Sequence, residues 1–326
     1  MSLAHRLNYY RRIFPAYLGR RNSHLTFWHD SPEINLRSAA HKLGEYYMPF
    51  LEKADYPGPY DAGGIPLLDY QGSLGRQYNP IAVAQFGLGN FNAFCRSGDL
   101  ARRQKFLGIA DWLVVNLETN RAGLRVWNHH FNWEYRTTLR APWHSALAQG
   151  QGISVLVRAY SETQDSRYME AAQYAFAAFQ KETGDGGVLH VDQRGDLWLE
   201  EYIVSPPTHI LNGFIWAMWG VYDYWLTTAD DAARQLFAAT TATLKRNLVS
   251  YDAGFWSLYE LAGTRLKMLA SPFYHRLHIA QLGVLHKLTG EEIFARYAGK
   301  WSAYRYNFFN RNAALAYKSA FKLLYY

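Results

Sequence analysis

Apolar residues recur in four long segments of the chain, and each segment begins with small or amide-bearing residues. The segments are AVAQFGLGNF, SALAQGQGISVLVRAY, HILNGFIWAMWGVYDYW and HIAQLGVLHKL. Their matching amides are Gln85, Gln149, Asn212 and Gln281, and the differences between these residue numbers are 64, 63 and 69. A period of this kind predicts one structural unit that is used four times along the chain.

A second helical segment follows each of these four, and its apolar residues lie on one side only. The second segments are DLARRQKFLGIADWLVV, SRYMEAAQYAFAAF, TADDAARQLFAATTATL and TGEEIFARYAGKW. The last has Thr289 three residues before Glu292, which is the pattern of a capping box. Helices that are apolar nearly all round are buried, and one-sided helices cover them. The pattern therefore predicts a fold dominated by α-helices, an α/α toroid that forms an incomplete α/α barrel of helical hairpins.

Long connections rich in aromatic and charged residues join the hairpins. They are RAGLRVWNHHFNWEYRTTLRAPWHS, GDGGVLHVDQRGDLWLEEYIVSPPTH and YDAGFWSLYELAGTRLKMLASPFYHRLH. The middle one alternates like a β-hairpin around QRGD, so we expect short β-hairpins in these rim loops. Long loops on one rim of a toroid are expected to line a cleft. We expect residues 1–60 to form an N-terminal arm packed on the barrel, and residues 61–326 to form the catalytic barrel domain.

The composition is that of a soluble globular protein with many aromatic residues. Of the 326 residues, 49% are hydrophobic and 19% charged, and the chain has 25 Tyr and 11 Trp. Aromatic side chains stack on sugar rings, and Trp127, Trp133, Trp143 and Trp198 are candidates for this role at the rim. The formal charge of +7 favours an anionic partner. No nucleic-acid-binding module is recognisable, which favours an acidic polysaccharide over nucleic acid.

Several other classes of site and of segment are not expected. Cys95 is the only cysteine, which excludes an intramolecular disulfide and a cysteine-based zinc cluster. The pairs His129–His130 and His275–His278 lack the spacing of a zinc helix, so no metal is assigned. The glycine-rich stretches lack the strand pattern of a dinucleotide site, so no cofactor is expected.

The sequence also gives an expectation for the cellular location. The most apolar stretch, ILNGFIWAMWGVYDYWL, contains Asn212 and Asp223 and is too short and too polar for an integral membrane segment. No signal peptide is recognised at the N-terminus, so we expect a soluble, cytoplasmic protein. Residues 3–18 could rest on a membrane surface.

Three of the rim segments carry acid and base groups. They are LEEY with Glu200, Glu201 and Tyr202, SLYEL with Tyr259 and Glu260, and SPFYHRLH with Tyr274, His275 and His278. Adjacent residues of a strand point to opposite faces, so Glu200 would share its side with Tyr202 and Glu201 would not. The pattern does not by itself single out one of these two glutamates as the catalytic group.

Four stretches resemble the catalytic helical domain of the heparosan glucuronyl C5-epimerases. They are APWHSALAQGQGISVLVRAY, WLEEYIVSPPTHILNGFIWAMWGVYD, LVSYDAGFWSLYEL and YHRLHIAQL. With the weaker QYNPIAVAQFGLGNF, the resemblance covers roughly residues 60 to 305. It implies an α/α barrel, conversion of D-glucuronate to L-iduronate within a polymer, no diffusible cofactor and a tendency to form homodimers.

The resemblance also implies roles for individual residues. Carried over by position, the family's essential groups fall on Glu201, Tyr202, Tyr259 and Tyr274. Leu261 stands where the family has an arginine, and Arg265 is a candidate to bind the uronate carboxylate in its place. The candidates for substrate binding are Arg265, His275, Gln149, Gln151, Asn212, Trp198, Trp143, Trp133 and Glu200.

Epimerisation at carbon 5 requires a base and an acid on opposite faces of the sugar, and a group that holds the carboxylate. We expect Glu201 and Tyr274 to be the opposed pair, with Tyr202 and Tyr259 on the carboxylate. A uronate polysaccharide lyase begins with the same proton abstraction and remains an alternative. An inverting glycoside hydrolase needs only two carboxylates, and a catalytically silent glycan-binding protein is the non-enzymatic alternative.

Overall fold

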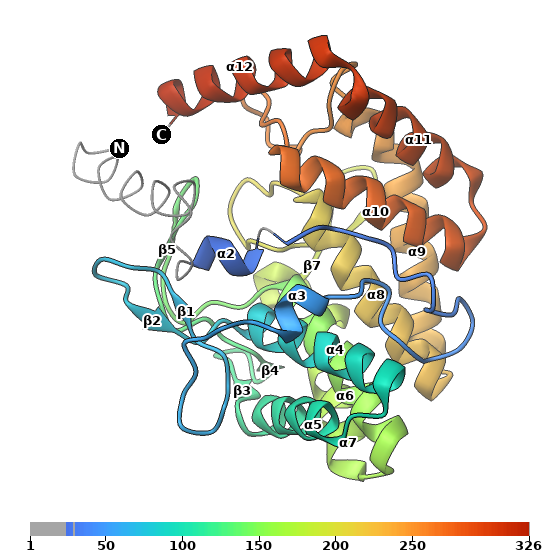
Figure 1. The fold of residues 1–326 in the computed structure, drawn as a ribbon. Coiled ribbons are helices and arrows are strands. Elements are labelled where there is room, and N and C mark those ends of the chain that lie inside the picture. The colour runs from blue at the N-terminus through green and yellow to red at the C-terminus, as the bar shows by residue number, and fades with distance from the viewer. Residues whose placement is uncertain (1–23, 29, 326) are drawn as a thin grey trace.

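Helices dominate the part of the chain that the computed structural model describes, residues 24–28 and 30–325 (Figure 1). Four helices form an inner row: α4 (Pro80–Ser97), α6 (Ala146–Thr163), α8 (Leu211–Thr228) and α10 (Pro272–Thr289). Each is followed by an outer helix: α5 (Leu100–Val115), α7 (Ser166–Phe176), α9 (Asp231–Asn247) and α11 (Glu292–Tyr306). The predicted α/α toroid is therefore confirmed, and the four amides that revealed its period all lie on inner helices.

Local sequence explains where these helices begin. The side chains of Asn79 and Ser145 accept hydrogen bonds from the first-turn amides of α4 and α6, and Ser271 does the same for α10. Such caps satisfy N–H groups that have no partner within the helix. The outer helices α5, α7 and α9 are capped by aspartates in the same way. The helices α8 and α11 have no side-chain cap, so the capping box that the sequence suggested at Thr289 and Glu292 is not formed.

The inner helices pack in the order α4, α6, α8 and α10, and α6 and α8 approach one another most closely. A Cβ atom placed on Gly150 of α6 would lie 2.7 Å from the Cα of Ala217 of α8, so only glycine permits this approach. The helices α10 and α4, both described in full, do not pack on one another to a comparable extent. The barrel is therefore incomplete, as predicted.

The segment of residues 30–50 crosses the C-terminal ends of the inner helices. The Tyr47 hydroxyl donates a 2.7 Å hydrogen bond to Asp223 of α8, which also forms a 2.6 Å ion pair with Arg158 of α6. The Asn92 side chain of α4 accepts a 2.7 Å hydrogen bond from the Tyr46 amide. This segment thereby closes the end of the barrel opposite to the rim loops. That an arm ends at residue 60 stays a prediction.

Short antiparallel strand pairs lie in the connections that lead to the inner helices. They are β1 (Leu68–Asp69) with β2 (Arg76–Gln77), β3 (Glu118–Thr119) with β4 (Arg125–Val126), β5 (Trp133–Glu134) with β6 (Thr138–Leu139), and β7 (Leu189–Val191) with β8 (Leu197–Leu199). The predicted β-hairpins of the rim loops are thus confirmed, including the one around QRGD.

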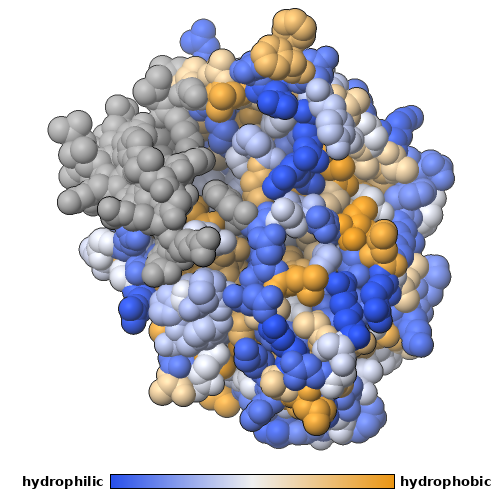
Figure 2. Space-filling view, in the orientation of Figure 1, coloured by the Kyte–Doolittle hydropathy of each residue, from blue (hydrophilic) through white to orange (hydrophobic). Residues whose placement is uncertain are grey.

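The remaining elements are short helices and a C-terminal helix. They are α2 (His24–Trp28), α3 (Leu51–Ala54), the 3₁₀ turns η1 (Ala177–Gln180), η2 (Thr183–Asp185) and η3 (Leu248–Tyr251), and α12 (Phe308–Tyr325). Within the described ranges, no helix combines the length and the apolar character needed to cross a bilayer. Residues 3–18, considered for a membrane surface, lie outside the described residues. The face in Figure 2 is largely hydrophilic, with apolar residues in small groups.

Candidate active site

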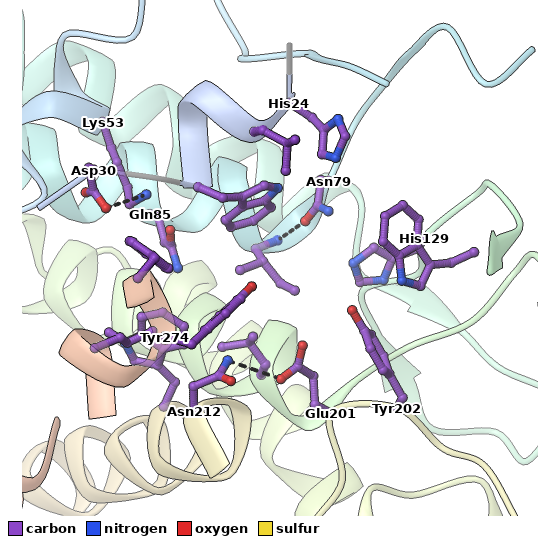
Figure 3. Close-up of a pocket in the computed structure, with 18 of the residues that line it drawn as sticks. His24, Asp30, Lys53, Asn79, Gln85, His129, Glu201, Tyr202, Asn212 and Tyr274 are labelled. Carbon is purple, nitrogen blue, oxygen red and sulfur yellow. Dashed lines mark hydrogen bonds and ion pairs between the residues drawn. The ribbon is translucent and has the colours of Figure 1, made fainter. Parts of the chain in front are cut away.

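A cavity lies at the N-terminal ends of the inner helices, where the rim loops deliver the chain (Figure 3). Residues of all four inner helices line part of it, and residues of the rim loops and of the segment 24–53 line the rest. The lining includes His24, Trp28, Asp30, Lys53, Asn79, Gln85, His129, Trp133, Trp143, Glu201, Tyr202, Asn212, Trp216, Phe273 and Tyr274. With a volume of about 230 Å³, it has far more room than the ~30 Å³ that one water occupies in the liquid.

Glu201 is held in this cavity by its neighbours. Its side chain accepts a 3.3 Å hydrogen bond from the Asn212 amide, and Tyr202 lines the cavity beside it. A Cβ on Gly213 would lie 2.2 Å from the Glu201 Oε2, so the glycine at the start of α8 makes room for the carboxyl. Glu201 is only 5% exposed, and this burial raises its pKa to about 8. Such a group exchanges a proton readily near neutral pH.

Glu200 is directed away from the cavity. Its Oε1 lies 2.5 Å from the Nδ1 of His209, and its other oxygen accepts a 3.3 Å hydrogen bond from the His209 amide. The sequence argument that put Glu200 and Tyr202 on one side assumed a strand through all three residues. That assumption is wrong, because β8 ends at Leu199 and the chain bends at Glu201 and Tyr202. Glu201 and Tyr202 line the cavity together.

Aromatic side chains surround Tyr202. The Trp143 ring lies 5.8 Å from the Tyr202 ring, edge to face, and Trp133 also lines the cavity. Burial beside the Glu201 carboxylate raises the pKa of Tyr202 well above its ordinary value. Trp143 also stacks flat on His129 at 3.8 Å. Trp133 and Trp143 therefore line the cavity, and their stacking on a sugar stays a prediction.

Tyr274 enters the cavity from the first turn of α10. Its amide donates to the capping Ser271 side chain, which fixes the direction in which the tyrosine leaves the backbone. The Tyr259 ring lies 4.9 Å away. Burial, together with the nearby Glu201 carboxylate, raises the pKa of Tyr274 above its ordinary value, and Tyr259 offsets only part of that rise. Tyr259 is buried and does not line the cavity. It touches Tyr274 from behind, instead of facing a ligand directly.

The inner helices also give the cavity a favourable electrostatic environment for anions. The four helix N-termini lie at this end of the barrel, and none of them has an acidic residue in its first turn. Helix N-termini carry a partial positive charge that stabilises nearby anions. His129 contributes no charge, because burial lowers its pKa to about 3.

Two of the four predicted tryptophan platforms are packing residues. Trp198 is 1% exposed and stacks on His209 at 4.2 Å. Trp127 is fully buried, and its indole donates a hydrogen bond to the Leu113 carbonyl. Neither lines the cavity. Neither ring therefore offers an exposed face at this cavity, because each fills the interface between a rim loop and the helices beneath it.

Other predicted binding residues act behind the cavity wall. Gln149 accepts a hydrogen bond from the Trp127 amide, and Gln151 accepts one from Gln85, which does line the cavity. His275 stacks on Trp256 at 3.8 Å and lies 2.8 Å from the Ser257 hydroxyl. Gln149, Gln151 and His275 thus connect helices and loops, and they do not line this cavity.

Arg265 is exposed and does not line the cavity, which corrects the expectation that it binds the carboxylate. Asn212, in contrast, contacts Glu201 inside the cavity. Glu260 pairs with Arg136 and also accepts a hydrogen bond from Tyr135.

The sequence reading missed the contribution of the segment that precedes the barrel. His24, Trp28, Asp30 and Lys53 line the cavity, although they were assigned only to a packing arm. No periodic pattern marks them, and their contacts with the barrel are distant in sequence. Gln85, also in the lining, had a signal, since it occupies the repeat position of Asn212. Among the described residues, no cluster of three or more His, Cys, Asp or Glu could hold a metal ion.

The model of the D-glucuronyl C5-epimerase C-terminus matches residues 121–303, which is more than half of the chain. The chain belongs to this family. The D-glucuronyl C5-epimerase of Caenorhabditis elegans is 33% identical over 216 residues, which cover 62% of this chain and 35% of that protein. An uncharacterised protein of Methanocaldococcus jannaschii is also 33% identical, over 59% of this chain and 62% of its own length. The chain thus spans about a third and about three fifths of these relatives.

A solved structure supports the fold assignment. The cellobiose 2-epimerase of Spirochaeta thermophila superposes with a TM-score of 0.52 at 15% identity, over 89% of this chain and 68% of that one. At this identity the likeness concerns the toroid alone. The family match includes Glu201, Tyr202, Asn212 and Tyr274, whereas His24, Trp28, Asp30 and Lys53 precede it.

Proposed function

We propose that this member of the C5-epimerase family converts D-glucuronate to L-iduronate within an acidic polysaccharide. The observation that carries the proposal is the meeting of Glu201, Tyr202 and Tyr274 in one cavity, although they come from two separate connections of the barrel. The chemistry needs a carboxylate and phenols around one sugar, and a hydrolase would give the tyrosines no role.

In the proposed reaction, the Glu201 carboxylate removes the proton from carbon 5 of the uronate. The electron pair moves into the adjoining carboxylate, and the Tyr274 hydroxyl delivers a proton to the opposite face of the same carbon. Proton exchange with solvent then restores the two side chains. Burial suits both groups, because it raises the pKa of Glu201 and keeps the hydroxyl of Tyr274 protonated.

The negative charge that develops on the uronate carboxylate needs a partner at the cavity wall. Tyr202 and Asn212 supply hydrogen-bond donors beside Glu201, and the N-terminus of α8 lies next to them. Tyr259 acts through Tyr274 in this scheme, as a positioning residue. Leu261 at the position of the family's arginine is compatible with this arrangement, since neutral donors and the helix end share the task.

The deciding experiment is incubation with a heparosan-type polymer in heavy water, followed by NMR at carbon 5. The proposal predicts deuterium at carbon 5 and the appearance of iduronate, without cleavage of the chain. A product that absorbs in the ultraviolet would identify a lyase, and new reducing ends would identify a hydrolase. Tight binding with no exchange at carbon 5 would reject catalysis and leave a glycan-binding protein.

A further inference from the structure

The segment 24–54 forms a wall of the cavity that is separate from the catalytic residues. Helix α2 ends at Trp28, Asp30 follows it, and α3 carries Lys53. In Figure 3, Asp30 and Lys53 lie across the cavity from Glu201 and Tyr202. We call this segment the arm wall. It precedes the residues matched to the family, as do α4 and α5 of the barrel.

Asp30 and Lys53 form a buried pair of opposite charge in this wall. The Lys53 ammonium lies 3.3 Å from the Asp30 carboxylate, and their side chains are 3% and 10% exposed. Lys53 also donates a 2.5 Å hydrogen bond to the Phe27 carbonyl. An ammonium has three N–H groups, and these two contacts use two of them. Within the described ranges, no third oxygen acceptor is seen for it. The ammonium also lies 4.5 Å from the centre of the Phe27 ring and 5.6 Å from that of Phe50, and Lys53 lines the cavity.

Such a pair contributes little to stability as a packing device. Removing two charges from water costs several kcal/mol, and apolar residues of similar size often serve a fold equally well. Among the described residues that line the cavity, Lys53 is the sole lysine or arginine. A buried acceptor and donor side by side on a cavity wall therefore suggest contact with a polar ligand.

A flat aromatic ring adjoins the pair. Trp28 lines the cavity, and the Lys53 nitrogen lies 5.7 Å from the centre of its ring. The Phe27 ring meets it edge to face at 5.3 Å, which restricts how it can turn. Sugars present an apolar ring face and hydroxyls at the edge, and each hydroxyl both donates and accepts. A tryptophan beside a carboxylate and an ammonium complements these features.

We infer that the arm wall is a second sugar subsite, in which Trp28 stacks on the sugar linked to the reacting uronate while Asp30 and Lys53 bind its hydroxyls. The inference rests on the proposed function for the identity of the reacting sugar. The position of the pair across the cavity from Glu201 assigns it to a neighbouring sugar. Its net neutrality favours hydroxyls over a second carboxylate, because Asp30 would repel an anion placed beside Lys53.

The first test compares a heparosan oligosaccharide with methyl glucuronide, which has no neighbouring sugar. For Trp28→Ala, Asp30→Asn and Lys53→Met, kcat/KM for the oligosaccharide is expected to fall about 10-fold to 100-fold, mainly through KM. The loss with methyl glucuronide is expected to be at least tenfold smaller. Trp28→Phe, which keeps an aromatic face, should recover most of the loss. Glu52→Gln changes an exposed neighbour on α3 and is the matched control. It should leave the ratio of kcat/KM for the oligosaccharide to kcat/KM for methyl glucuronide unchanged.

The second test measures binding without turnover and so does not depend on the reaction. Calorimetric titration of Glu201→Gln with the oligosaccharide is compared with the same titration of Glu201→Gln/Trp28→Ala and Glu201→Gln/Lys53→Met. Affinities about tenfold weaker in the double variants support the subsite, even if the wild type proves inactive at carbon 5. Equal affinities in folded variants, checked by thermal melting, would overturn it. Equal losses on both glycans would also overturn it, since the wall would then act on the reacting sugar or on the fold.

Discussion

The barrel and the arm wall contribute to one cavity in different ways. The barrel is regular, with four hairpins, and it brings together Glu201 and Tyr202 from the connection after α7 and Tyr274 from the first turn of α10. The arm wall has two short helices, and it brings Trp28 and Lys53 from chain that precedes the family match. The difference suggests a division in which the barrel carries the proton chemistry and the arm selects what flanks the reacting sugar.

The two regions are joined by buried polar contacts at the far end of the barrel. The Asp223 carboxylate of α8 accepts hydrogen bonds from the Tyr47 hydroxyl of the arm wall and from the Arg158 guanidinium of α6. The Arg158 guanidinium also donates to the Gly44 carbonyl. Because these groups are inaccessible to water, removing one of them leaves a buried charge or polar group without a hydrogen-bonding partner. Substitutions can therefore separate catalysis, arm docking and sugar selection.

The largest expected effect is that of Glu201→Gln, which removes the proposed base. Turnover should fall by about 10⁴, at the upper end of what general acid–base groups contribute. The amide is nearly the same size, so the fold and the oligosaccharide affinity should persist. Deuterium exchange at carbon 5 measures the rate. Near-normal exchange in a folded variant would show that the barrel's base lies elsewhere.

Glu200→Gln is the matched control for that variant. Its carboxylate contacts His209 and not the cavity. The change should therefore lower the free energy of unfolding by about 1–3 kcal/mol, while kcat falls far less than in Glu201→Gln. Urea unfolding and exchange rates on the same sample separate the two effects. A larger loss of kcat in Glu200→Gln than in Glu201→Gln would reverse the assignment of the adjacent carboxylates.

Asp223→Ala tests the joint between arm and barrel. The change leaves the buried Arg158 without its counter-ion, so unfolding should require about 3–5 kcal/mol less free energy. Urea titration followed by tryptophan fluorescence measures this. If stability is unchanged, the two regions are held together by apolar packing alone.

The tyrosine pair tests how the barrel delivers the second proton. Tyr274→Phe should lower kcat by about 10²–10³, because it removes the proposed donor. Tyr259→Phe should lower it less, since Tyr259 meets Tyr274 from outside the cavity. Steady-state rates of the two variants with one polymer provide the comparison. An equal or larger loss for Tyr259→Phe would place that residue on the substrate.

The pH dependence tests the burial of Glu201. Its pKa of about 8 means that the free enzyme holds the proton at lower pH, so the base form grows as the pH rises. Values of kcat/KM should increase about tenfold per pH unit below that pKa and then level off. Exchange rates between about pH 5.5 and 9 measure the profile. A rate that falls over this range would make Glu201 the acid.

The smallest effect is expected for Tyr47→Phe, which removes one hydrogen bond between arm and barrel. The ring and its packing on Trp219 remain, so about 1 kcal/mol should be lost. The same urea titration as for Asp223→Ala applies. A loss as large as that of Asp223→Ala would make the Tyr47 hydroxyl the principal contact of the joint.

Some parts of the site could be predicted from sequence and others could not. Asn212 and Gln85 were visible because they recur at the period of the inner helices. Strand alternation could not show which of Glu200 and Glu201 enters the cavity, because β8 ends at Leu199, just before the pair. Trp198 and Trp133 look alike in aromatic rim loops, but one packs on His209 and the other faces the cavity. Side-chain direction at the end of a strand depends on what packs against it.

The sequence alone determined the helical hairpins, their order and the loops that carry the acid and base groups, because periodicity and capping act over a few residues. Only the tertiary structure decided which of two adjacent carboxylates enters the cavity, that Tyr259 lies behind Tyr274, and that Lys53 reaches the site at all. These outcomes depend on contacts between residues far apart in the chain, such as Asp30 with Lys53 and Tyr47 with Asp223. Such contacts form only when the whole barrel packs, and no local pattern records them.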